Sequence, residues 1–167
     1  EELGLDQVEL TYEQIQDPFC KAFWPEFKGR DGCRTPIPWT AEGAHAGFTT
    51  GEPWLPIPAR HQARAVDRQL AQPGSVLRQL ANFLAWRQQQ PALRLGSQKL
   101  LVRGDCLCIQ REQGGRQLTG WFNLGPVPAE IPVPRQSRLA HSADGVAFSG
   151  KRLTLPGWGF AFIEPHA

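Results

Sequence analysis

The chain reads Gly29-Arg30-Asp31-Gly32-Cys33-Arg34-Thr35-Pro36-Ile37-Pro38-Trp39 and, shortly afterwards, Ala46-Gly47-Phe48-Thr49-Thr50-Gly51. Closely spaced glycine and proline prevent this stretch from forming a regular helix or a central strand. We therefore expect residues 18–65 to form a mostly ordered loop. A loop of that length inside a compact domain usually lines a binding site or covers a scaffold, so the stretch indicates a binding role.

Helical periodicity flanks this loop on both sides. Residues 75–90 give the clearest pattern, with Ser75 as the N-cap and Pro91 as the stop. Residues 62–71 predict a second, shorter helix that ends before Pro73. Residues 6–17 show mild helical periodicity. Helix is thus expected in only a minority of the chain.

From residue 99 onward the pattern changes to short β-like runs separated by glycine or proline. The paired glycines Gly114-Gly115 predict a hairpin, and Gly150 predicts another turn. These features indicate a small antiparallel sandwich or barrel over residues 97–167. The expected strands cover residues 99–103, 105–111, 117–124, 129–133, 145–148, 151–155 and 159–164.

Composition narrows the class of protein. The chain has 167 residues, of which 41% are hydrophobic and 20% are charged, as in a folded globular protein. A net charge of +2 without a basic run argues against nucleic acid as a partner, and the apolar runs are too short to span a membrane. The absence of methionine, including an initiator, leads us to expect a segment of a longer protein.

Cysteine and histidine suggest no metal site or cofactor. The four cysteines have no Cys-x-x-Cys spacing, and the pair two residues apart on an expected strand is poorly placed for a disulfide, so we expect free thiols in a reducing cytoplasm. The histidines are scattered without metal-ligand spacing and are expected at the surface or in loops. These residues are Cys20, Cys33, Cys106, Cys108, His45, His61, His141 and His166.

The segment 29–51 closely resembles the region after the eighth barrel strand in bacterial α-glucosidases of glycoside hydrolase family 13. The flanking stretches Glu1–Leu5 and Asp17–Glu26 agree with it, and the helix around Trp86-Arg87 is similar to the last barrel helix of that family. The resemblance implies an α+β fragment. Residues 1–96 would form the end of a (β/α)8 barrel, with the long loop and the last helices, and residues 97–167 an all-β antiparallel sandwich domain.

The same resemblance implies a function and a site. Arg34 is the preferred residue for binding the glucose at the non-reducing end of an α-glucoside oligosaccharide, because a guanidinium forks several donors toward hydroxyl groups. Arg30 is the alternative. Asp31 is expected to hold either guanidinium in place. Trp39 and Phe48 are expected to support the loop, because aromatic residues in a proline-rich loop more often serve as packing anchors than stack on sugar. The catalytic carboxylates of the family would all precede Glu1, so no catalytic residue is assigned.

The resemblance leaves three functions open. The first is part of an α-glucosidase that hydrolyses terminal α-linked glucose by a retaining mechanism. The second is a transglycosylating or isomerising relative, such as a sucrose isomerase or a trehalose synthase. The third is a non-catalytic carbohydrate-binding accessory domain. The apolar face of the helix at 75–90 is expected to pack on the β domain, on another copy of the chain or on the remainder of the parent enzyme.

Overall fold

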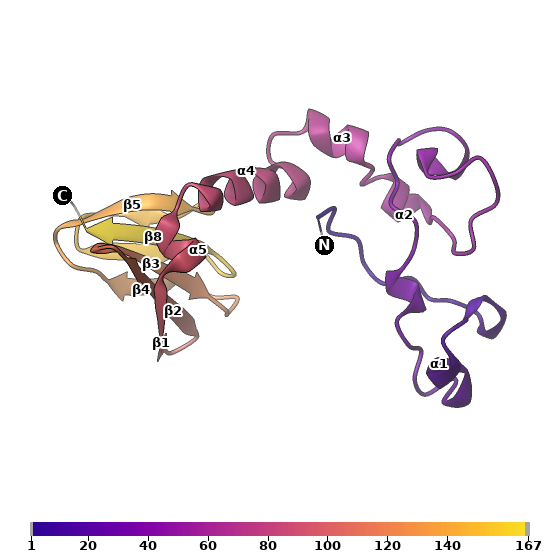
Figure 1. Cartoon of the computed structure of the whole chain (residues 1–167), viewed down its shortest axis with the longest axis horizontal. Coiled ribbons are helices and arrows are strands. Elements are labelled where there is room, and N and C mark those ends of the chain that lie inside the picture. The colour runs from indigo at the N-terminus through magenta and orange to yellow at the C-terminus, as the bar shows by residue number, and fades with distance from the viewer. Residues whose placement is uncertain (1, 166–167) are drawn as a thin grey trace. The chain divides into compact units, whose positions relative to one another are not determined.

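A computed structural model describes residues 2–165 of the chain. The backbone divides into two compact units, which we call the N-terminal unit, up to Leu84, and the C-terminal unit, from Ala85 onward. Figure 1 shows the short helices of the first unit and the strands of the second.

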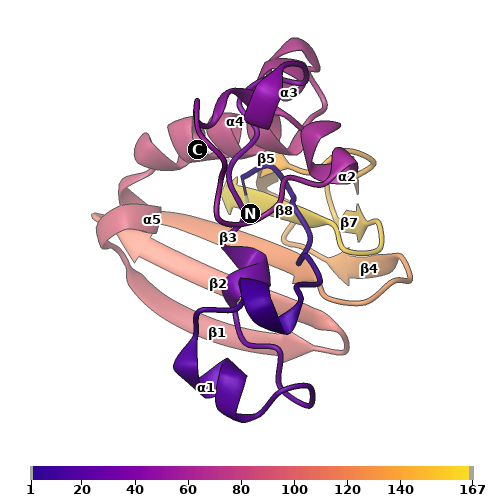
Figure 2. The same ribbon diagram turned by 90° about the vertical axis from the view of Figure 1, so that its right-hand side faces the viewer.

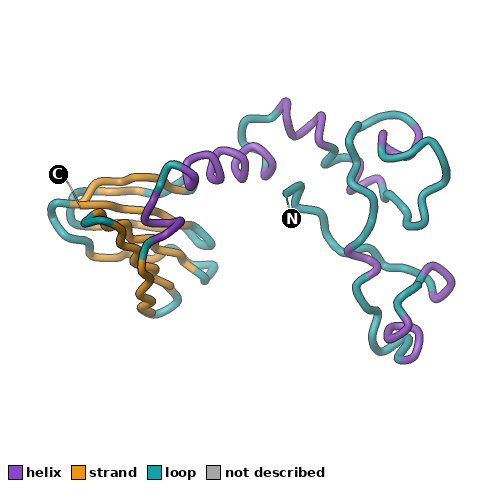
Figure 3. The backbone as a smooth tube through the Cα atoms, in the orientation of Figure 1, coloured by secondary structure: helices purple, strands orange, loops and turns teal. Residues whose placement is uncertain are grey.

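The N-terminal unit consists mainly of irregular backbone with short helical turns, as Figure 3 shows. This confirms the long ordered loop expected for residues 18–65, although several single turns of helix interrupt it. The helical segments are η1 (Tyr12–Gln14), α1 (Pro18–Ala22), η2 (Asp31–Cys33), η3 (Ala44–Gly47), α2 (Ala59–Gln62) and α3 (Val66–Ala71).

Two helices predicted in this unit are wrong in detail. Residues 6–17 contain only the short 3-10 turn η1, because the Val8 N–H donates to Gly32 O at 3.0 Å and thereby joins the distant loop instead of a helical turn. The short helix predicted within 62–71 is present as α3, but a break after α2 delays its start to Val66. At the break, the Val66 N–H donates to Pro38 O at 2.9 Å. In both places a bond to the loop replaces a local helical bond.

The longest helix, α4 (Val76–Gln88), corresponds to the helix predicted at 75–90. Its predicted cap is confirmed, because Ser75 Oγ accepts the Arg78 N–H at 3.3 Å. No residue of α4 is buried. Pro91 does more than stop this helix: it begins a further short helix, α5 (Pro91–Leu95), which the periodicity missed.

The C-terminal unit contains the end of α4 and α5, followed from Ser97 by two antiparallel sheets, as expected. One sheet has the strand order β1-β2-β3-β8-β5 and the other β4-β7-β6; Figure 2 shows β1, β2 and β3 side by side. The strands are β1 (Ser97–Arg103), β2 (Cys106–Gln113), β3 (Arg116–Asn123), β4 (Ala129–Pro132), β5 (Ser137–Ser142), β6 (Ala147–Phe148), β7 (Arg152–Leu155) and β8 (Phe160–Pro165). Only β5 was not predicted, because its Ser-Arg-Leu-Ala-His-Ser sequence lacks clear alternation and a register shift interrupts its pairing with β8.

Both predicted turns are present. Gly114 and Gly115 have φ values of +57° and +76° between β2 and β3, where Gln113 pairs with Arg116. Two positive φ values in a two-residue hairpin favour glycine at both positions. Gly150, with φ of +60°, lies in the connection between β6 and β7.

The core of this unit is formed by buried side chains from both sheets. These are Cys106, Ile131, Val133, Leu153, Leu155, Ala161 and Ile163. Cys106 and Cys108 are two apart on β2, so both point to the buried face of the strand. All four cysteines are free thiols, and burial raises the pKa of both Cys106 and Cys108. These two side chains act as small apolar core residues.

Candidate functional site

The segment 29–39 is held from several sides, and one of its anchors is the buried side chain of Asp31. One carboxylate oxygen, Oδ2, accepts the backbone N–H groups of Gln16 at 2.8 Å and Asp17 at 3.0 Å. The other oxygen, Oδ1, accepts a hydrogen bond from Arg34 Nη1 at 2.6 Å. The Asp31 side chain is 1% exposed, whereas that of Arg34 is 54% exposed. A buried carboxylate therefore holds an arginine whose guanidinium still reaches solvent.

The protonation of Asp31 reflects two opposing effects. Burial acts to raise the pKa of the carboxyl group, but the hydrogen bonds from the Asp17 and Gln16 N–H groups and from Arg34 outweigh it, so the pKa lies below the ordinary aspartate value. Asp31 is thus a carboxylate at neutral pH. This charge is what pairs with Arg34.

Gly32 allows the segment to lie directly on the backbone of residues 7–8. A Cβ atom at this position would lie 2.2 Å from Val8 O, closer than atoms can approach. The same approach lets the Val8 N–H reach Gly32 O at 3.0 Å. The glycine of the Asp-Gly pair is therefore required by packing.

Thr35 contacts a histidine that the sequence did not single out. Its Oγ1 lies 3.4 Å from His61 Nδ1, and His61 Nε2 lies 2.9 Å from both the O and the Oδ1 of Asp6. The expectation that His61 is a surface or loop histidine is wrong, because its side chain is completely buried. Polar neighbours from two distant segments make that burial tolerable. His166 lies outside the described residues.

The end of the segment is bound to α3 and to the loop around η3. Trp39 O accepts the Asp67 N–H at 3.1 Å, and the Trp39 N–H donates to Ala46 O at 2.8 Å. His45 and Ala46 have φ values of +50° and +48°, a left-handed conformation that costs energy in residues other than glycine. The loop that carries Phe48 is therefore held in one strained shape.

The predicted site residues differ in their surroundings. Arg34 and Asp31 are brought together, whereas Arg30 is exposed and forms no ion pair among residues 2–165. Trp39 and Phe48 are 51% and 49% exposed, so neither is a fully packed anchor. Trp54, by contrast, donates from Nε1 to Gln14 O at 2.8 Å and fastens the loop to the start of the chain.

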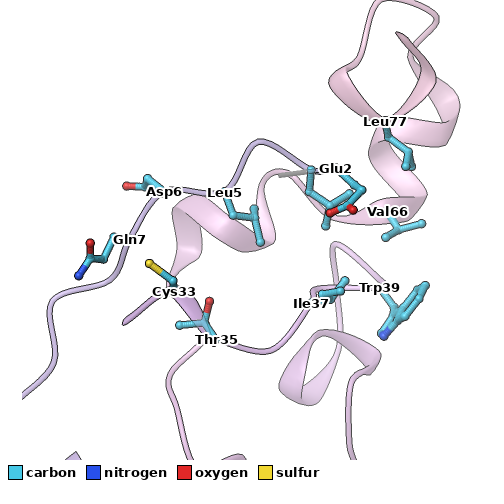
Figure 4. A pocket seen from close by; sticks show the side chains of 11 residues that line it. Glu2, Leu5, Asp6, Gln7, Cys33, Thr35, Ile37, Trp39, Val66 and Leu77 are labelled. Carbon is cyan, nitrogen blue, oxygen red and sulfur yellow. The ribbon is translucent and has the colours of Figure 1, made fainter. Parts of the chain in front are cut away.

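A pocket of about 600 Å³ opens beside this segment within the N-terminal unit. Figure 4 shows the side chains of Trp39, Ile37 and Thr35 on the segment side, facing the first residues of the chain and the helices α3 and α4. The lining residues are Glu2, Leu3, Leu5, Asp6, Gln7, Cys33, Thr35, Ile37, Trp39, Val66 and Leu77. Trp39 belongs to this lining, and Arg34 and Phe48 do not.

Among residues 2–165, no three His, Cys, Asp or Glu side chains gather closely enough to hold a metal ion. In the same part of the chain, no helix combines the length and the apolar character needed to cross a membrane.

Comparison with known sequences finds a family match and similar proteins. The family model described as "Alpha amylase, catalytic domain" matches residues 1–96. A "probable alpha-glucosidase" of Rhizobium meliloti (strain 1021) is 40% identical over 167 residues, which are 98% of this chain and 30% of that protein. An oligo-1,6-glucosidase of a Bacillus species (strain F5) is 33% identical over 119 residues, covering 70% of this chain and 22% of that protein.

Solved structures agree with these matches. The alpha-glucosyl transfer enzyme XgtA superposes with a TM-score of 0.86 at 42% identity, covering 99% of this chain and 31% of that enzyme. The trehalulose synthase MutB of Pseudomonas mesoacidophila has a TM-score of 0.82 at 24% identity, covering 98% of this chain and 34% of the synthase, and it supports the fold alone. The chain thus spans about a third or less of the length of the proteins it matches.

Proposed function

Because this chain belongs to the alpha-amylase family, glycoside hydrolase family 13, we propose that it is the C-terminal part of an α-glucosidase. The parent enzyme would hydrolyse terminal non-reducing α-linked glucose from oligosaccharides with retention of configuration. In this proposal residues 1–96 complete the (β/α)8 barrel, and residues 97–167 form the β-sandwich domain. The loop at 18–65 would lie at the mouth of the barrel, where enzymes of this fold build their active sites.

One observation carries the proposal: the buried Asp31 carboxylate holds the half-exposed guanidinium of Arg34 at 2.6 Å. Only one Arg34 nitrogen contacts Asp31 in this pair, so the remaining N–H groups are available to sugar hydroxyls. A guanidinium held in one orientation loses less freedom when it binds a ligand. We assign Arg34 to the binding of the terminal glucose and Asp31 to the support of Arg34.

Arg30, Trp39 and Phe48 have secondary roles in this proposal. Arg30 directly precedes the turn η2, and its side chain is exposed. It is the alternative arginine for sugar contact. Trp39 and Phe48 are fastened through the hydrogen bonds around Ala46, which supports a role in shaping the loop. Their exposed ring surface also suits stacking against a sugar or against the rest of the barrel.

The bond-cleaving residues are proposed to lie in the part of the parent enzyme that precedes this chain. A retaining glycosidase needs two carboxyl groups about 5 to 5.5 Å apart, one as nucleophile and one as acid and base. We assign no such pair and no cofactor to this chain. We propose the cytoplasm as the location of the parent enzyme, because four free thiols suit a reducing compartment.

A second candidate function is glucosyl transfer instead of hydrolysis. The 42% identity with an alpha-glucosyl transfer enzyme over almost the whole chain favours it. Both reactions share the glucosyl-enzyme intermediate, and they differ in whether water or another hydroxyl compound takes up the glucosyl group. The proposed Arg34 contact with the terminal glucose serves both. A non-catalytic accessory role is the third candidate.

The test uses the full-length parent enzyme with p-nitrophenyl α-glucoside and an added sugar acceptor. Arg34→Ala is expected to lower kcat/KM by about 10- to 150-fold, since a charged hydrogen bond contributes roughly 1.5 to 3 kcal/mol. Arg30→Ala is the matched comparison: it is expected to lower kcat/KM less than Arg34→Ala does, and a larger loss in Arg30→Ala would assign the sugar contact to Arg30. Free glucose as the main product indicates hydrolysis, and a new disaccharide indicates transfer. Equal activity of Arg34→Ala and wild type would defeat the assignment, and an inactive full-length protein would favour the accessory role.

A further inference from the structure

His61 joins three stretches of the N-terminal unit that are distant in sequence. Its ring lies between the Asp6 segment and Thr35, and its own backbone belongs to α2. A completely buried imidazole is costly unless both ring nitrogens have hydrogen-bond partners. Asp6 supplies two acceptors for one nitrogen, and Thr35 supplies a hydroxyl for the other.

The partners define which ring nitrogen carries the proton. Nε2 lies 2.9 Å from the O and 2.9 Å from the Oδ1 of Asp6, and both atoms can only accept. Nε2 is therefore the N–H donor. In the neutral imidazole, Nδ1 is then an acceptor, and the Thr35 hydroxyl donates to it across 3.4 Å. The ring thus has one orientation that satisfies all its neighbours.

Asp6 is itself paired with an arginine. Arg60 Nε donates to Asp6 Oδ2 at 2.8 Å, and Arg60 Nη2 donates to Gln7 O at 3.2 Å. The hydrogen bond from Arg60 is the main reason that the pKa of Asp6 lies below its ordinary value. Asp6 thus remains a carboxylate and a dependable acceptor for His61.

Thr35 directly follows Arg34, and this neighbour relation gives the buried histidine a functional meaning. Asp31 and Gly32 hold the turn before Arg34, through residues 16–17 and Val8. His61 holds the residue after it. The Arg34 backbone is therefore fixed on both sides. A fixed backbone restricts the positions that the guanidinium can take and reduces the freedom lost on binding.

We propose that His61 is a positioning residue that acts through Thr35 to align Arg34 with the terminal glucose of the substrate. This inference rests on the proposed function, in which Arg34 binds that glucose. Neither His61 nor Thr35 is assigned a contact with the reacting atoms. Their loss should therefore weaken substrate binding and raise KM, while kcat stays close to that of the wild type.

The experiment compares Thr35→Val, Thr35→Ser and His61→Phe in the full-length parent enzyme, with p-nitrophenyl α-glucoside as substrate. Thr35→Val keeps the shape of the side chain and removes its hydroxyl group. It is expected to raise KM by about 2- to 12-fold, the effect of one neutral hydrogen bond, without changing kcat. Thr35→Ser restores the hydroxyl group and should return KM to the wild-type value. The double variant His61→Phe with Thr35→Val should have the same KM as His61→Phe alone.

The outcomes separate this inference from the proposed function. An unchanged KM in Thr35→Val, together with a raised KM in Arg34→Ala, overturns the role of His61 and leaves the role of Arg34 intact. An unchanged kcat/KM in Arg34→Ala defeats the proposed function first. A fall in kcat at constant KM, or no recovery in Thr35→Ser, also overturns the inference. If His61→Phe does not fold, the comparison of Thr35→Val with Thr35→Ser decides alone.

Discussion

The Nη1 atom of Arg34 lies 2.6 Å from Oδ1 of Asp31, and the second oxygen of the same carboxylate accepts the N–H groups of residues 16 and 17. One buried aspartate thus links an exposed arginine to a backbone segment 14 and 15 residues earlier. Asp31 begins the turn η2, and Arg34 directly follows it. Asp31 therefore contributes both to the stability of the loop and to the orientation of Arg34.

Replacement of Asp31 by asparagine should destabilise the chain by about 1–3 kcal/mol. The amide keeps one acceptor oxygen, but its NH₂ group faces either Arg34 or the backbone N–H donors, and the charge that pairs with Arg34 is lost. Urea denaturation of the chain measures the difference. Glu26→Gln is the control, because Glu26 is an exposed carboxylate in the same loop. Equal loss of stability in both variants would contradict the role of Asp31.

The pH dependence gives an independent check on the same residue. The pKa of Asp31 in the folded chain lies below its ordinary value of 3.8. Its contribution to stability is therefore fully present above that value and is lost as the pH falls below it toward the folded pKa. The stability difference between wild type and Asp31→Asn should shrink as the pH is lowered from about 6 to about 3.

Gly32→Ala should destabilise the chain by about 1–3 kcal/mol, the usual effect of forcing an extra methyl group into a packed site. The new Cβ would lie 2.2 Å from Val8 O, so the backbone of the turn or of residues 7–8 must move. Gly51→Ala is the matched control, because no atom lies within 4 Å of a Cβ built there. Thermal denaturation of the two variants measures the difference in stability. Similar melting temperatures would show that the turn accommodates the extra methyl group without strain.

His141 should make the C-terminal unit sensitive to mild acid. Burial lowers the pKa of His141 below its ordinary value of 6.5, so the folded unit favours the neutral ring. The C-terminal unit therefore has its full stability above pH 6.5. It becomes less stable as the pH falls through that value, because the unfolded chain takes up the proton more readily.

The phenylalanine variant tests this behaviour. His141 stacks on Trp86 with ring centroids 4.6 Å apart, and His141→Phe keeps an aromatic ring at this position while removing the titration. Relative to this variant, the wild type should lose stability between about pH 7 and pH 5. Urea denaturation of both proteins at these two pH values measures the difference in their free energies of unfolding. A constant difference between the two proteins across that range would rule out His141 as the cause.

The sequence predicted Arg34 and Asp31 as residues of the site but not His61. The segment 29–39 identified Arg34 and Asp31 as a pair of interest, although it left open whether Asp31 would hold Arg30 or Arg34. His61 was not recognised, because its partners lie 26 and 55 residues away and no local pattern marks them. Strand β5 was missed for a similar reason, since its pairing with β8 compensates for a weak local pattern.

The sequence alone determined the local features: the Ser75 cap, the glycine hairpin at 114–115, most strands of the β domain and the loop around Arg34. These depend on the conformational preferences of residues a few positions apart. Only the tertiary structure decided which contacts that loop makes, including the pairing of Asp31 with Arg34 and the burial of His61 between Asp6 and Thr35. Most of these contacts join segments distant in the chain, and even the pairing of Asp31 with Arg34 instead of Arg30 depends on how the folded turn orients its side chains.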